Sequence, residues 1–102
     1  DKIASLEAVD VLFIGPLDLS MELGIFGQFD HPRFVESVEK TVNAPRASGK
    51  TAGILLPDLK YFNFYHEMGM RFFAAGSDGV FVADGALRMF SELNDLRVTS
   101  NK

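Results

Sequence analysis

The sequence contains no cysteine among its 102 residues. Disulfide bridges, thiolate zinc sites and cysteine nucleophiles are therefore excluded, and the absence fits a cytoplasmic protein. The longest apolar run, Val11 to Ile14, is far too short to span a bilayer. The chain starts at Asp1 with neither a methionine nor the apolar segment of a secretory signal. We therefore expect either a processed product or a segment of something longer.

Positive charge is also scarce and dispersed. Ten lysines and arginines face fourteen aspartates and glutamates, which gives a net charge of −4. Phosphate groups are bound by clustered basic side chains, and no such cluster occurs in the sequence. Neither nucleic acid nor a membrane is therefore expected as a partner.

The overall composition is typical of a globular protein. Hydrophobic residues make up 47% and charged residues 24%, and ten phenylalanines need covering. A chain of this length holds one modest core. We treat residues 1–102 as a single partial domain, with a frayed polar tail over residues 98–102.

Strand and helix signals alternate along the chain. Short apolar runs bounded by glycine or proline predict strands, and apolar residues at helical spacing predict helices between them. The expected strands are residues 9–14, 50–56 and 70–75, and the expected helices are residues 32–44, 57–69 and 85–96.

Other segments have weaker signals. Residues 3–8 are predicted to end a helix, and residues 17–30 to form a loop with one helical turn near Ser20. Pro45 is expected to kink or end its helix near Ala44. Residues 80–84 fit either a short strand or a helix.

This alternation is typical of an α/β fold built from consecutive βα units with parallel strands. A (β/α)₈ barrel uses about 31 residues per unit, so the chain holds about three units. Two architectures remain open, a small open α/β domain and a piece of a barrel. Both predict parallel strands that are adjacent in sequence order.

Each expected strand is followed by an aspartate within a few residues. Asp18, Asp58 and Asp78 would converge at the carboxyl end of a parallel sheet, where carboxylates could hold Mg²⁺ or Mn²⁺. Helix capping is the favoured interpretation for Asp58 and Asp78, whereas metal binding is favoured for Asp18. The two histidines, His31 and His66, have no partner at ligand spacing and are expected in surface or capping roles.

The segment from residue 9 to residue 20 reads VDVLFIGPLDLS and resembles the HpcH/HpaI aldolase/citrate lyase family of metal-dependent class II pyruvate aldolases. The resemblance extends over residues 3–90. Its further matches are Gly24, His31-Pro32, the A-x-G-K-x-A-G-I segment at residues 47–54, Gly69-x-x-Phe72 and Gly76-Ser77-Asp78.

The resemblance implies that the chain is the carboxyl-terminal part of a (β/α)₈ TIM barrel, from the sixth strand onward. It implies a carbon–carbon lyase that cleaves 4-hydroxy-2-oxoacids to pyruvate and an aldehyde through a metal-stabilised enolate. Asp18 would be a ligand of a divalent metal ion, with magnesium, manganese and cobalt as candidates. Gly15, Pro16 and Leu17 would lie beside the pyruvyl carboxylate, and Leu55 would form a pocket wall.

By the same resemblance, the partners are a small-molecule 2-oxoacid substrate and, at full length, further copies in a homo-oligomer through the last helix. The family's glutamate ligand, arginine and histidine–aspartate pair would lie upstream, so no catalytic residue is expected within this chain. The chain alone is expected to be inactive. Two alternatives stay open: a truncated, catalytically inactive family product with a structural or interaction role, and an unrelated small α/β binding domain.

Overall fold

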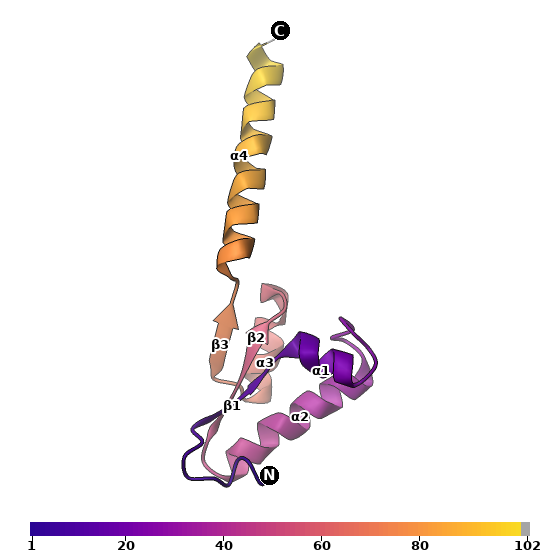
Figure 1. Ribbon diagram of the computed structural model, residues 1–102, viewed down its shortest axis with the longest axis vertical. Coiled ribbons are helices and arrows are strands. Elements are labelled where there is room, and N and C mark those ends of the chain that lie inside the picture. Colours follow the sequence, from indigo (N-terminus) through magenta and orange to yellow (C-terminus); the bar gives the residue numbers. More distant parts are fainter. Residues whose placement is uncertain (101–102) are drawn as a thin grey trace.

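The computed structural model describes residues 1–100, with side chains up to Val98. Its three strands are β1 (Val11–Ile14), β2 (Thr51–Leu56) and β3 (Phe72–Ala75). They form one sheet in the order β1-β2-β3, and both pairs are parallel (Figure 1). The predicted α/β fold and strand order are therefore confirmed.

Four α-helices and one 3₁₀ turn connect and follow these strands in the described part of the chain. They are α1 (Pro16–Glu22), α2 (Pro32–Ala47), η1 (Leu59–Tyr61), α3 (Phe62–Met68) and α4 (Asp78–Ser100). Figure 1 shows α2 lying across the sheet, whereas α4 extends away from the rest of the molecule. None of the described helices combines the length and the apolar character needed to cross a bilayer.

The core lies between one face of the sheet and α2. Phe34, Val38 and Val42 recur every fourth residue, so they share one side of α2 and are buried there. They join the buried sheet residues Ile14 and Ile54 in one hydrophobic cluster. The remaining buried members are Ile25, Ala52, Leu56, Tyr65 and Met70.

No described helix covers the opposite face of the sheet at its centre. The register aligns Phe13, Gly53 and Phe72 in one row across the three strands. Above Gly53, the two phenylalanine rings meet edge to face with centroids 5.8 Å apart. Phe13 remains 46% exposed and Phe72 52% exposed. Large aromatic side chains therefore lie on the uncovered face.

Gly53 is required by this row. A Cβ atom at residue 53 would lie 2.3 Å from the Phe72 carbonyl oxygen and 2.8 Å from the Phe72 Cβ. We expect Gly53→Ala to lower the free energy of unfolding by about 1–3 kcal/mol, since β3 must shift to admit the methyl group. Chemical denaturation measures the change.

The matched control is Gly85→Ala, because an added Cβ at residue 85 of α4 meets nothing within 4 Å. This change should be neutral or stabilise by about 0.5–1 kcal/mol through helix propensity. Equal effects of the two substitutions would contradict the packing of Gly53 against β3.

Two predictions near the amino terminus are wrong. Residues 3–8 form turns rather than a helix end. Residues 16–22 form α1 rather than a loop, with Pro16 in the first helical position, where its missing N–H costs nothing. The proline that stops β1 therefore also starts a helix, and seven residues are too few to show a helical period.

Two further predictions about helix ends need correction. The helix does not end at Ala44, because α2 continues through Pro45 to Ala47. Only Arg46 and Ala47 follow Pro45 in α2, so the single hydrogen bond that the proline cannot donate is lost near the end of the helix. The last helix is longer than predicted: α4 includes residues 80–84 and continues through Val98 to Ser100. The rest of the predicted tail, residues 101–102, lies outside the described residues.

Tyr65 carries a buried hydroxyl group that has no hydrogen-bond partner in the described part of the chain. Burial raises the pKa of Tyr65 to about 12, and Tyr61 and Asp30 add smaller electrostatic contributions. The folded state therefore favours the neutral phenol more strongly than the unfolded state does.

This pKa has a consequence for stability at alkaline pH. Because the folded pKa exceeds the unfolded value of about 10, the contribution of Tyr65 is fully present below pH 10 and is lost as the pH rises towards 12. Tyr65→Phe should remove this loss of unfolding free energy, which is at most about 3 kcal/mol. At pH 7 the free energy of unfolding should stay equal or rise, because the substitution removes a buried hydroxyl group that has no partner among the described residues. Urea unfolding at pH 7 and pH 11 tests both statements. An unchanged alkaline loss in Tyr65→Phe would assign it to other groups.

Candidate functional site

Asp18 lies in the first turn of α1, directly after the carboxyl end of β1. An added Cβ at Gly15 would lie 3.6 Å from the Asp18 Oδ2 atom, so the carboxylate lies against the start of the helix. Asp18 is exposed, and a carboxylate in the first turn is favoured by the helix dipole. Its oxygens are therefore accessible to a cation.

The other expected site residues lie at the same edge of the sheet. Ile14 pairs with Ile54, so the next residues along the two chains, Gly15 and Leu55, are level with each other. Leu55 is 38% exposed on the uncovered face, Leu17 is exposed, and Pro16, the first residue of α1, is buried. The structure thus brings Gly15, Asp18 and Leu55 to one end of the sheet.

An open hollow of about 470 Å³ lies beside Asp18. Its polar lining includes Asp18, Glu22 and Thr41, and its apolar lining includes Phe13 and Leu19. Asp18 and Glu22 are four residues apart on α1, so both carboxylates lie on the same side of that helix. The hollow therefore has carboxylate and hydroxyl oxygens, the donor type that hard cations prefer, beside an apolar wall.

The structure does not bring the three strand-end aspartates together. The Asp58 carboxylate accepts the Lys60 N–H at 2.9 Å and caps η1. The Asp78 carboxylate accepts the Gly79 N–H at 2.8 Å at the start of α4. No group of three or more histidines and acidic residues suited to a metal ion occurs among the described residues. The favoured capping role of Asp58 is confirmed, and the convergence of three carboxylates is wrong.

Both histidines make contacts that stabilise the fold. The His31 Nδ1 atom accepts the Arg33 N–H at 3.1 Å, so His31 caps α2. The His66 ring stacks on Phe62, with centroids 5.6 Å apart, and lies 6.5 Å from the Phe73 ring. These contacts agree with the surface and capping roles expected for the two residues.

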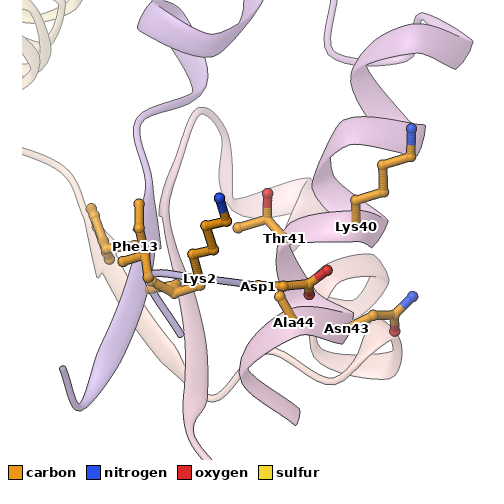
Figure 2. Close-up of a pocket in the computed structure, with 9 residues that line it drawn as sticks. Asp1, Lys2, Phe13, Lys40, Thr41, Asn43 and Ala44 are labelled. Carbon is orange, nitrogen blue, oxygen red and sulfur yellow. The ribbon is translucent and has the colours of Figure 1, made fainter. Parts of the chain in front are cut away.

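A larger hollow, of about 930 Å³, lies elsewhere (Figure 2). It lies between the amino-terminal segment, β1 and α2, and its lining includes Lys2, Phe13 and Lys40. Figure 2 shows Lys40 and Asn43 directed away from Phe13, so its polar groups do not converge. Of the residues predicted for the site, Gly15 and Asp18 line the smaller hollow, and none lines this one.

Sequence reasoning gave no role to Ser20 or Glu22. Ser20 is completely buried, and its hydroxyl bridges α1 to the following turn. Its place in the G-P-x-D-L-S segment was a usable signal. Glu22 could have been identified only by recognising α1 as a helix, because the i, i+4 spacing then places it beside Asp18.

The sequence is similar to those of known proteins. The sequence model of the HpcH/HpaI aldolase/citrate lyase family matches residues 1–85. A hydroxypyruvate/pyruvate aldolase of Pseudomonas aeruginosa is 42% identical over 78 residues, which cover 76% of this chain and 29% of that protein. A 5-keto-4-deoxy-D-glucarate aldolase of Shigella boydii is 43% identical over 82 residues, which cover 79% of this chain and 32% of that protein.

Solved structures give the same result. An HpcH/HpaI aldolase/citrate lyase family protein from Burkholderia cenocepacia superposes with a TM-score of 0.82 and 28% identity, over 91% of this chain and 36% of that one. An HpcH/HpaI aldolase from Desulfitobacterium hafniense gives 0.79 and 27%, over 89% of this chain and 36% of that one.

The chain spans about a third of the length of these relatives. Within that third, both the sequence and the βα units match, including the strand end that carries Asp18. This chain therefore belongs to the HpcH/HpaI aldolase/citrate lyase family.

Proposed function

We propose that this chain is the carboxyl-terminal part of a barrel aldolase that depends on a divalent metal ion. The complete enzyme would cleave 4-hydroxy-2-oxoacids to pyruvate and an aldehyde. The observation that carries the proposal is the accessible Asp18 carboxylate beside Gly15, at the carboxyl end of β1. In parallel α/β barrels, active sites lie at this end of the strands. The curated relatives are aldolases, which supports the reaction class.

The donor set fits one side of a magnesium or manganese site, and cobalt is a third candidate. Asp18 would supply the carboxylate ligand, and Glu22 lines the same hollow. Further oxygen donors must come from substrate, water or residues of other barrel strands, because these ions need about six ligands. When bound, the ion would supply Lewis-acid polarisation of a 2-oxo group.

The remaining site residues would position the substrate. Backbone groups at Gly15, Pro16 and Leu17 would lie beside the carboxylate of a 2-oxoacid, where the chain turns from β1 into α1. Leu55, level with Gly15 on the uncovered face, would form an apolar wall. We assign no proton-transfer residue within the chain. A cytoplasmic location is part of the same proposal, because the curated relatives are bacterial aldolases.

The open sides of the sheet support a partial domain over residues 1–102. Within the described residues, β1 and β3 each pair along only one edge. The 930 Å³ hollow flanks β1, where a further βα unit would pack in a closed barrel. Phe13 and Phe72 would then point into the barrel interior and lose their exposure to water.

The metal assignment predicts the effect of Asp18→Ala in the full-length protein that contains this chain. Pyruvate release with added Mn²⁺ or Mg²⁺ should fall by more than the roughly 10–100-fold that is typical of changes around a metal's ligands. The free energy of unfolding should change by no more than about 1 kcal/mol, because Asp18 is exposed.

Glu39→Gln is the matched control, since Glu39 is an exposed acidic residue of α2 outside the hollow. It should leave pyruvate release unchanged. Full activity in Asp18→Ala would remove Asp18 from the site, and robust activity of the 102-residue chain alone would contradict the partial-domain assignment.

We further propose that the complete protein is a homo-oligomer held in part by α4. Val80 and Leu87 lie on one side of this helix, whereas Val82, Met89 and Leu93 lie on the opposite side, by the 100° rotation per residue. All five are at least half exposed. A helix that is apolar on opposite sides is normally covered on both, and one side could face its own barrel while the other faces a neighbour.

A charge on α4 should therefore weaken assembly. Leu93→Glu in the full-length protein should shift the mass towards smaller species, because it places a carboxylate in an apolar contact. Sedimentation or light scattering measures the mass. Arg88→Gln, a polar change on the same helix, should leave it unchanged. An identical mass in both variants would argue against an interface at this part of α4.

A further inference from the structure

Ser20 is a polar residue with no exposed surface. Its hydroxyl donates a hydrogen bond to the Leu17 carbonyl at 3.0 Å and accepts one from the Gly27 N–H at 3.1 Å. The Ser20 carbonyl also accepts the Ile25 N–H at 2.9 Å. Ser20 thus connects α1 to the turn that follows it, and we call these three hydrogen bonds the Ser20 latch.

The Ser20 latch acts directly on the peptide unit that precedes Asp18. The Leu17 carbonyl belongs to the same planar peptide as the Asp18 nitrogen. A hydrogen bond to that carbonyl therefore restrains the peptide plane, and with it the direction of the Asp18 Cα–Cβ bond. The restrained residue is the one whose carboxylate lies against Gly15.

The helix has little other means of holding its orientation. It has seven residues, and isolated helices of this length are not stable in water. Leu19 and Leu23 are partly buried and pack against the core, and Arg33 Nη1 donates to the Leu23 carbonyl at 3.0 Å at the end of the helix. Beside Asp18, the Leu19 N–H donates to the Gly15 carbonyl at 2.9 Å, and the Ser20 hydroxyl donates to the Leu17 carbonyl. Of these two bonds, only the one from Ser20 is made by a side chain.

We propose that Ser20 is a positioning residue for metal binding, which holds the Asp18 carboxylate in the orientation that a divalent cation requires. This inference rests on the proposed function. Ser20 would not touch the ion, because its oxygen is buried and engaged in two hydrogen bonds. It acts through the Leu17–Asp18 peptide.

The test measures binding of Mn²⁺ alone to the full-length protein that contains this chain, by calorimetry or by electron spin resonance of the free ion. Ser20→Ala should weaken binding by about 10-fold, the lower end of the range for residues that orient metal ligands. Ser20→Thr keeps the hydroxyl group and should stay closer to the unmodified protein than Ser20→Ala does.

Two controls separate positioning from general destabilisation. Val42→Ala removes core volume beside Gly69, the residue that follows α3, and should lower the melting temperature without changing Mn²⁺ affinity in the folded protein. Ser5→Ala removes a comparable hydroxyl bond, to the Lys2 carbonyl at 2.7 Å, and should change neither quantity. A Ser20→Ala variant that melts lower but binds Mn²⁺ normally would overturn the inference.

A measurement on the unmodified protein keeps the test valid if Ser20→Ala does not fold. If the Ser20 latch strengthens Mn²⁺ binding, then Mn²⁺ binding must stabilise the latch, and the two equilibrium constants change by the same factor. Hydrogen exchange of the Gly27 amide should then slow by up to about 10-fold with saturating Mn²⁺. The Gly49 amide follows α2 and donates to the Arg46 carbonyl, and its exchange should be unaffected by Mn²⁺. Unchanged exchange at Gly27 would overturn the inference.

The proposed function and this inference fail differently. If Asp18→Ala binds Mn²⁺ as well as the unmodified protein does, the metal assignment is wrong and the positioning role falls with it. If Asp18→Ala loses binding while Ser20→Ala retains it, the metal assignment stands and only the positioning role is rejected.

Discussion

Parallel pairing of β1, β2 and β3 is the constraint on which the rest of the structure depends. It directs every strand's carboxyl end to one edge, so the residues that follow the strands meet there whatever their separation in sequence. Gly15 and Leu55 are forty residues apart by number and level in space. The direction of the strands therefore determines where the candidate site residues meet, and the side chains determine only its chemistry.

The two faces of the sheet have different roles. One face is closed by α2, whose Phe34, Val38 and Val42 complete the core. The other carries Phe13 and Phe72 on either side of Gly53 and leaves both rings partly in water. An aromatic surface of this kind on an open parallel sheet is unusual, because such sheets are normally covered on both faces. In the family's barrels the uncovered face would become the interior.

The candidate site contains few possible ligands. Asp18 and Glu22 supply carboxylates from one helix, and the described residues add no third acidic or histidine ligand. The described residues do restrain the short helix α1. The Ser20 latch, the Arg33 contact to Leu23 and the glycine at residue 15 all act on it. A chain with few ligands can still determine how one of them is held.

The sequence alone determined the fold class, the strand order and the family, because apolar runs, turn residues and the segment at residues 9–20 are local signals. It also indicated the capping roles of His31 and Asp58. Only the tertiary structure decided that residues 16–22 are a helix and that the three strand-end aspartates form no metal-binding group among the described residues. It also showed that Ser20 is buried. The helix was not predicted because seven residues are too few to show a helical period. The burial of Ser20 and the separate roles of the aspartates depend on how the segments pack, which local propensity does not encode.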